Sequence, residues 1–266
     1  MRSIGIIGCG NMGSALARGM AEARLFPAGR IVGYDADPKK SARLARGLKM
    51  KAARSVRETA ACPVVLLAVK PQQMHKVLAE IRPFLSHQPL LISIAAGIRT
   101  NWIERRTGRG VPVVRVMPNT PALVKKGISA IAAGRSAGVK HRALAEKIFR
   151  SVGEVVQIEE RFMDAVTAVS GSGPAYFFYL MEQMERAGTG LGLPAQTARR
   201  LAMATAQGAG KLAVCSGENP AILRKKVTSK GGTTEAAFKV FKRGRMGEII
   251  QAGVRAAARR AKELSG

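Results

Sequence analysis

Hydrophobic residues in the first 160 positions of this chain form short continuous runs separated by amphipathic stretches. Val64–Val69 is apolar throughout, as a strand that is covered on both faces requires. The alternation predicts successive β-α-β units and a mostly parallel sheet. The expected strands are Ser3–Ile7, Arg30–Tyr34, Val64–Val69, Leu90–Ala95, Pro112–Met117, Ile128–Ala132 and Glu154–Ile158. The expected helices between them are Ser14–Ala23, Pro38–Leu48, Gln72–Phe84 and Lys140–Ser151.

After about residue 160 only the helical period continues. The expected helices are Arg161–Val169, Pro174–Gly190, Pro194–Cys215, Pro220–Thr228, Thr233–Phe241 and Met246–Leu264. We therefore predict an α/β protein with a doubly wound, Rossmann-type domain over residues 1–160 and an all-α domain over residues 161–266. So many apolar and small helix faces in a short stretch indicate that a second subunit completes the core. The aromatic run 176–179 is interpreted as helix packing, with lining of a pocket as the alternative.

A glycine-rich turn follows the first expected strand. It reads Gly8-Cys9-Gly10-Asn11-Met12-Gly13, a G-x-G-x-x-G pattern directly before a helix. In this context the pattern predicts a dinucleotide site: its glycines allow a tight turn and close approach of the pyrophosphate, and the helix N-terminus offers free N–H groups. We expect Gly8, Cys9, Gly10, Asn11 and Met12 to contact the cofactor.

The ribose end of this site gives two conflicting signals. Asp35 ends the second expected strand, where an acid holds ribose hydroxyls and repels a 2′-phosphate. Lys39, Lys40 and Arg43 follow closely and would attract that phosphate. The cofactor is therefore expected to be NADPH or NADH, and Asp35 favours the use of NADH.

Three further loops follow expected strands, at the edge where such sheets bind ligands. The first is Ala68-Val69-Lys70-Pro71, the second is Ala95-Ala96-Gly97, and the third presents Asn119 between two prolines. We expect these residues to border the cofactor, with Lys70 reaching ribose or phosphate oxygens. The alternative for each loop is that the glycines and prolines only form a turn.

Charge and cysteine content limit the remaining possibilities. The chain has 44 Lys and Arg against 17 Asp and Glu, a net charge of +27, and these basic residues are spread along its whole length. A solvated basic surface is favoured over a dedicated nucleic-acid site, and its field would attract anionic ligands. No apolar run approaches the roughly 20 residues of a membrane span. Three cysteines without metal-ligand spacing and no leader predict a cytoplasmic protein without a metal site.

Six motifs together resemble the pyrroline-5-carboxylate reductase family over the whole chain. They are I-G-x-G-N-M-G at the start, L-A-V-K-P at 67–71, S-I-A-A-G at 93–97, R-V-M-P-N-T-P at 115–121, S-G-S-G-P-A-Y at 170–176 and V-T-S-x-G-G-T-T at 227–234. The resemblance implies reduction of the cyclic imine 1-pyrroline-5-carboxylate to L-proline with NAD(P)H. It also implies a homodimer that can assemble into larger rings, such as a decamer built of dimers.

The resemblance also implies roles for residues beyond the glycine-rich turn. Thr234 would hydrogen-bond the ring nitrogen as the catalytic contact, and Thr233 with the loop Ser229, Gly231 and Gly232 would hold the substrate carboxylate. Glu160 falls where the family has an acid near the substrate, and Lys226 where a polar residue approaches the cofactor from the partner subunit. Two departures are Lys230, where the family usually has Pro, and Asp35, where members that prefer NADPH more often carry a neutral or basic residue.

The residue chemistry agrees with an imine substrate. An iminium is already a good electrophile, so its reduction depends less on a strong general acid than ketone reduction does. The three histidines all precede residue 160 and lie outside the cofactor motifs, which disfavours lactate- or malate-type dehydrogenases. Hydroxyacid dehydrogenases of this layout need a Lys that the stretch 174–179 lacks. The alternatives are a reductase for another imine or hydroxyacid, and a binding protein that has lost catalysis.

Overall fold

The computed structural model describes residues 3–264 of the 266-residue chain and forms two compact units. The first comprises residues 3–171 together with 257–264, and the second is Ser172–Ala256. The last turns of the C-terminal helix thus belong to the first unit. The division into a dinucleotide-binding domain over residues 1–160 and a helical domain over residues 161–266 stays a prediction.

The first unit is built on one eight-stranded sheet with strand order β3-β2-β1-β4-β5-β6-β7-β8. The strands are β1 (Ile4–Ile7), β2 (Ile31–Tyr34), β3 (Lys51–Ala52), β4 (Val64–Leu67), β5 (Leu90–Ser93), β6 (Val113–Met117), β7 (Gly127–Ala133) and β8 (Gly153–Gln157). All pairings are parallel except that of β6 with β7. The order reverses between β1 and β4, which is the switch point of a doubly wound sheet. The predicted fold class is confirmed.

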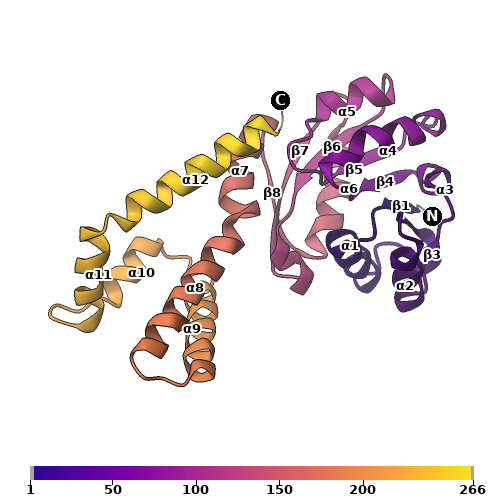
Figure 1. Ribbon diagram of the computed structural model, residues 1–266. Coiled ribbons are helices and arrows are strands. Elements are labelled where there is room, and N and C mark those ends of the chain that lie inside the picture. The colour runs from indigo at the N-terminus through magenta and orange to yellow at the C-terminus, as the bar shows by residue number, and fades with distance from the viewer. Residues whose placement is uncertain (1–2, 265–266) are drawn as a thin grey trace. The chain divides into compact units, whose positions relative to one another are not determined.

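Helices cover both faces of this sheet (Figure 1). They are α1 (Asn11–Glu22), α2 (Pro38–Leu48), α3 (Val56–Ala60), α4 (Met74–Ile81), α5 (Thr100–Thr107), α6 (Val139–Arg150) and the short α7 (Met163–Val166). The helices α1, α2 and α6 contribute to one buried cluster, and α3, α4 and α5 contribute to another. The two clusters explain why the central strands are apolar on both faces.

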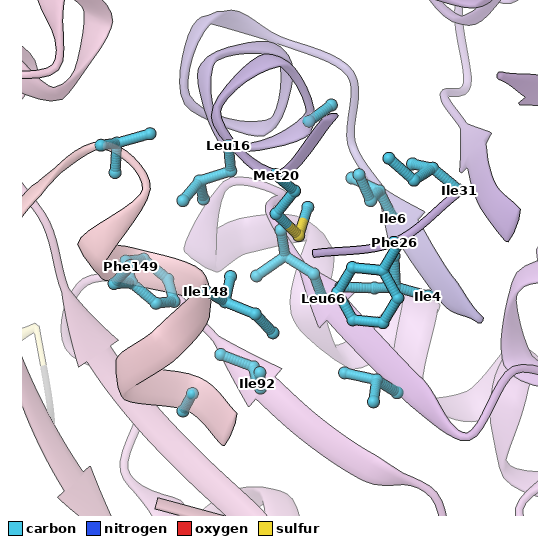
Figure 2. Packing of buried hydrophobic residues seen from close by; sticks show 14 of the residues in the cluster. Ile4, Ile6, Leu16, Met20, Phe26, Ile31, Leu66, Ile92, Ile148 and Phe149 are labelled. Carbon is cyan, nitrogen blue, oxygen red and sulfur yellow. The ribbon is translucent and has the colours of Figure 1, made fainter. Parts of the chain in front are cut away.

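Figure 2 shows the first of these clusters from close by. Leu16 and Met20 of α1 and Ile148 and Phe149 of α6 are fully buried, together with the inward side chains of β1, β4 and β5. Burying side chains of this size contributes about 1.5–3 kcal/mol each. The cluster therefore fixes the start of α1 relative to the end of β1, where the glycine-rich turn lies.

The second unit is entirely helical. It contains α8 (Gly173–Gly190), α9 (Ala195–Ser216), α10 (Pro220–Lys226), α11 (Thr233–Arg243) and the larger part of α12 (Met246–Glu263). Helices α8 and α9 pack closely at Gly188, where an added Cβ would lie 3.1 Å from the Cβ of Ala198. Small side chains there let the two backbones approach, as the composition of the predicted helix 194–215 indicates.

Many apolar side chains of this unit are exposed. Phe177, Phe178 and Tyr179 on α8 are 62–65% exposed, and large apolar residues on α9 and α12 are also exposed. The aromatic run is therefore not covered by its own chain, and its packing against other helices stays a prediction. Exposed apolar surface of this extent is typical of an interaction surface. Within residues 3–264 no helix has the length and apolar character needed to cross a bilayer.

Four elements differ from the sequence-based expectations. Strand β3 and helices α3 and α5 were not predicted, since they are short and carry weak periodicity. The helix expected over 161–169 is instead a 3₁₀ turn (Glu160–Phe162), α7 and a π-helical turn (Thr167–Gly171). Such π turns are frequent at functional sites.

Candidate active site

Four loops meet at one edge of the sheet. Strands β1, β4, β5 and β6 run parallel in neighbouring positions, so the loops that follow them lie at their shared carboxyl edge. These loops are 8–13, 68–71, 95–97 and 118–121. The structure thus brings together four of the segments that the sequence predicts to border a cofactor.

The glycines of the first loop are required by close backbone contacts. Gly8 has a φ of +103°, and a Cβ there would lie 2.4 Å from the carbonyl oxygen of Ala68. A Cβ at Gly13 would lie 2.0 Å from the carbonyl oxygen of Gly8. At Gly10, by contrast, no heavy atom lies within 4 Å of the Cβ position. Gly8 and Gly13 therefore form the turn, whereas Gly10 leaves space beside the backbone.

The start of α1 is suited to an anionic group. Gly10 is its N-cap and provides no side-chain cap, and the first turn contains no acidic residue. In the described part of the chain the amides of Asn11, Met12 and Gly13 have no hydrogen-bond acceptor, while Ser14 N–H donates to Gly10 at 2.9 Å. Free N–H groups and the helix dipole together favour a phosphate at this point. The residues present therefore fit a dinucleotide.

Asp35 is held in place by two backbone amides. Its Oδ2 accepts from Cys9 N–H at 2.8 Å and its Oδ1 from Asp37 N–H at 2.9 Å. The carboxylate thus ties the end of β2 to the glycine-rich turn. Asp37 in turn caps α2 by accepting from Lys39 N–H at 3.0 Å. Two carboxylates therefore lie at the start of α2, where they bind the amides of Asp37 and Lys39.

The thiol of Cys9 lies beside the Asp35 carboxylate in the glycine-rich turn. Burial of the thiol, together with the nearby Asp35 carboxylate, raises its pKa from 9.0 to about 12. Its Sγ lies 3.6 Å from the carbonyl oxygen of Tyr34. The side chain of Cys9 is therefore a neutral packing group at neutral pH. Its backbone is engaged as well, since its N–H donates to Asp35 and its carbonyl oxygen accepts from Ser14 Oγ at 2.9 Å.

The second and third loops present different groups. Lys70 follows β4 and is exposed, and in the described residues its ammonium group has no acidic partner, so it is free to bind an anion. Ala95 and Gly97 follow β5 and are buried, and Gly97 has a φ of +78°. The turn is closed by Ile98 N–H donating to Ala95 at 3.3 Å. This loop can offer backbone and small side chains only.

Asn119, in the fourth loop, has both ends of its amide engaged. Its Oδ1 accepts from Ile128 N–H at 3.0 Å, and its Nδ2 lies 3.4 Å from Ser170 Oγ. Nearby, a Cβ at Gly171 would lie 2.5 Å from Met117 Cε. The structure therefore uses Asn119 to join the loop after β6 to the π-helical turn. Its predicted contact with the cofactor stays a prediction.

Glu160 takes part in a network that joins three elements of the first unit. Its Oε1 accepts from Thr100 N–H at 2.7 Å and its Oε2 from Thr100 Oγ1 at 2.6 Å. Arg115 Nη1 lies 3.4 Å from Oε1, and Arg115 Nη2 lies 3.8 Å from Asp164. Since its oxygens are bound by the protein, Glu160 anchors the chain after β8, and its predicted contact with substrate stays a prediction.

Arg115 is the charge at the centre of this network. The residue is 2% exposed, and burial lowers its pKa, while Glu160 and Asp164 oppose that effect. Its Nη2 has no hydrogen-bond partner in the described residues, although it is close enough to Asp164 for a Coulombic attraction. The roles of Thr100 and Arg115 were not predicted from the sequence. The motif R-V-M-P-N-T-P contains Arg115, but nothing in the sequence pairs Thr100 with a residue 60 positions away.

The second unit contains the predicted substrate loop. Gly231 has a φ of +74° and its N–H donates to Glu235 at 2.7 Å, while Gly232 N–H donates to Ser229 at 3.1 Å. Gly232 is the N-cap of α11 and provides no side-chain cap. Thr233 and Thr234 are therefore the first two residues of α11, and neither caps the helix. In the described residues their hydroxyl groups and amides have no protein partner.

Lys226 ends α10 in the same unit. Its Nζ lies 2.6 and 2.8 Å from the two carboxylate oxygens of Glu218. Within the chain the ammonium group is therefore paired, and its predicted approach to a cofactor in another subunit stays a prediction.

The strand order, the switch point and the open glycine-rich turn place the protein in the class of Rossmann-type dinucleotide-binding proteins. Residues 3–97 match the family described as "NADP oxidoreductase coenzyme F420-dependent", and residues 160–264 match "Pyrroline-5-carboxylate reductase dimerisation". The chain is 41% identical over 264 residues to a pyrroline-5-carboxylate reductase from Pseudomonas aeruginosa, covering 98% of this chain and 96% of that one. The chain belongs to the pyrroline-5-carboxylate reductase family, and it is an NAD(P)-dependent oxidoreductase.

Solved structures agree with this assignment. A pyrroline-5-carboxylate reductase from Coxiella burnetii is 36% identical, with a TM-score of 0.93 over 100% of this chain and 99% of that chain. A pyrroline carboxylate reductase from Plasmodium falciparum, solved with NADP bound, is 30% identical, with a TM-score of 0.89 over 100% and 98% of the two chains.

Proposed function

We propose that this protein reduces 1-pyrroline-5-carboxylate to L-proline by hydride transfer from NADPH or NADH, the last step of proline biosynthesis. The family assignment supports the reaction, and the open turn before α1 supports the dinucleotide. The observation that carries the substrate side is the start of α11, where free amides and two threonine hydroxyls follow a glycine pair.

The start of α11 is suited to the substrate carboxylate. The amides of Thr233, Thr234 and Glu235 point along the helix axis and have no acceptor among residues 3–264, and the helix dipole adds a partial positive charge. A carboxylate bound there would receive two or three hydrogen bonds. The carboxylate of Glu235 accepts from Gly231 N–H at 2.7 Å, and Lys239 Nζ lies 3.8 Å from the same oxygen.

The reaction requires a hydride at the imine carbon and a proton at the imine nitrogen. When bound, the reduced nicotinamide supplies the hydride. The chain's own contribution is to hold the ring: the carboxylate at the start of α11 fixes one end, and the Thr234 hydroxyl orients the nitrogen. Because the protonated imine is already electrophilic, this positioning supplies most of the catalysis.

We also propose that the protein acts as a homodimer, which can assemble into a decamer of dimers in the cytoplasm, with no membrane or nucleic-acid partner. The match of residues 160–264 to a dimerisation family and the exposed aromatic residues of α8 support the dimer. The net charge of +27 supports electrostatic attraction of the anionic cofactor and substrate.

A steady-state assay with the purified protein tests the proposed reaction. We expect oxidation of NADH and NADPH that depends on pyrroline-5-carboxylate, with proline as the product. A folded, oligomeric protein that turned over neither nucleotide would refute the proposal. Pyrroline-2-carboxylate, in which the imine carbon carries the carboxylate, is the control for another imine substrate.

A further inference from the structure

The end of the C-terminal helix lies against the loop that follows β5. A Cβ added at Gly97 would lie 2.6 Å from the carbonyl oxygen of Leu264, 2.9 Å from its carbonyl carbon and 3.2 Å from its Cβ. Both residues belong to the first unit, although α12 begins in the second. The backbone of Leu264 therefore occupies the place where any side chain at position 97 would have to go.

The terminal turn of α12 is ordered up to this contact. Leu264 N–H donates to Arg260 at 3.1 Å, which continues the helical pattern beyond Glu263. Ala261 in the same turn is 6% exposed, and Arg260 pairs with Glu263 at 2.8 Å. The contact at Gly97 is thus made by the hydrogen-bonded backbone of a helix, which cannot move aside as a flexible side chain could.

We propose that the last turn of α12 is a positioning element for the loop Ala95–Gly97, and that Gly97 is required because the Leu264 backbone packs on it. The inference rests on the proposed function and on the expectation that this loop borders the cofactor, close to the group that donates the hydride. The loop is short, follows a buried strand and offers only backbone and methyl groups. Displacement of about 1 Å there is enough to misalign a hydride donor.

Gly108 provides a matched control for this contact. Gly97 and Gly108 both have a positive φ, +78° and +104°, so alanine is strained at either position. No heavy atom lies within 4 Å of a Cβ at Gly108, whereas at Gly97 the helix end blocks it. Comparison of Gly97→Ala with Gly108→Ala therefore separates the packing of α12 from backbone strain.

The experiment compares four proteins: Gly97→Ala, Gly108→Ala, a chain lacking residues 262–266, and that shortened chain carrying Gly97→Ala. We expect Gly97→Ala to lower kcat about tenfold or more, because the loop must shift away from Leu264. The dissociation constant for NADH, measured by nucleotide fluorescence, should change by less than about threefold, since the pyrophosphate binds at α1. Gly108→Ala should leave kcat unchanged.

The shortened chain gives the decisive comparison. We expect it to have a reduced kcat, because the loop loses its support, and faster amide hydrogen exchange over residues 95–98. Gly97→Ala should cost less in this background than in the full chain, because the blocking carbonyl is gone. Unchanged kcat in the shortened chain, with an equal cost of Gly97→Ala in both backgrounds, would overturn the proposal and leave Gly97 a residue needed only for its φ.

A second variant, Ala261→Leu, tests the support of the loop by α12 without shortening the chain. If the shortened chain does not fold, Ala261→Leu in the full chain enlarges a buried side chain of the same turn, and the same loss of kcat and faster exchange are expected. Unchanged exchange over 95–98 in a folded Ala261→Leu protein would also contradict the proposal. Wild-type protein without turnover would refute the proposed function, whereas the exchange measurement would still decide whether α12 supports the loop.

Discussion

The amide of Asn119 lies 3.4 Å from the hydroxyl of Ser170, and its carbonyl oxygen accepts from the backbone of Ile128 at 3.0 Å. One side chain thus joins the loop after β6 to the π-helical turn that precedes α8. Asn119 and Ser170 are 51 positions apart, and through them the motifs R-V-M-P-N-T-P and S-G-S-G-P-A-Y meet in the fold.

We expect Asn119→Ala and Ser170→Ala to differ in stability. Asn119→Ala leaves a partly buried amide of Ile128 without an acceptor, which costs about 1–3 kcal/mol. Ser170→Ala removes only the longer contact and should cost less than about 1 kcal/mol. Denaturant unfolding at a fixed protein concentration measures both. Equal losses in the two variants would show that the Ile128 hydrogen bond is not the dominant one.

Glu160→Ala should act mainly on stability. The substitution removes the acceptor of Thr100 N–H and leaves Arg115 buried with Asp164 as its only carboxylate partner among the described residues. We expect a loss of roughly 1–3 kcal/mol in the free energy of unfolding. The exposed neighbour Glu159, paired with Arg161 at the surface, provides the control variant Glu159→Ala. A large rise in the substrate KM with unchanged stability would instead place Glu160 at the substrate.

Asp35→Ser should shift nucleotide choice towards NADPH. The substitution removes a negative charge that the Cys9 and Asp37 amides hold at the end of β2. We expect the ratio of kcat/KM for NADPH to that for NADH to rise about tenfold, equivalent to about 1.4 kcal/mol of relieved repulsion. Asp37→Ser, which removes the cap of α2, is the comparison variant. An unchanged ratio in Asp35→Ser would indicate that Lys39 and Lys40 decide the preference.

Thr234→Val should lower catalytic efficiency without lowering stability. Valine keeps the shape and removes the hydroxyl proposed to orient the ring nitrogen, so kcat/KM should fall about 10- to 100-fold. The melting temperature should stay nearly unchanged, because the N-cap of α11 is Gly232 and no side chain caps the helix. Thr233→Val should mainly raise the substrate KM. A lower melting temperature with normal kinetics in Thr234→Val would remove this residue from the active site.

The protein should not exist as a stable monomer. Phe177, Phe178 and Tyr179 are exposed on α8, and burying such aromatic surface stabilises an interface. Light scattering at micromolar concentration should give a mass of at least twice the 28.2 kDa of one chain. A folded species at the mass of one chain would contradict the proposed assembly.

The sequence by itself determined the sheet and the nucleotide turn, because both depend on local features. Continuous apolar runs specify buried parallel strands, as in β4, and a glycine-rich turn between a strand and a helix requires little beyond its own residues. The loop Ser229–Thr234 was also located correctly at the start of a helix, since paired glycines before threonines mark a helix N-terminus. The helices α3 and α5 and the two-residue strand β3 were not predicted, because they are short and their local periodicity is weak.

Tertiary structure decided which groups these residues contact. Asp35 and Glu160 were assigned to ligands from their positions, but their oxygens accept amides from Cys9 and Thr100, distant in the sequence and near in space. The packing of Leu264 on Gly97 joins residues 167 positions apart and follows from the path of α12, which no local pattern specifies. A sequence determines local conformation through dihedral and hydrophobic preferences, whereas the partner of a buried polar atom depends on how all the elements pack.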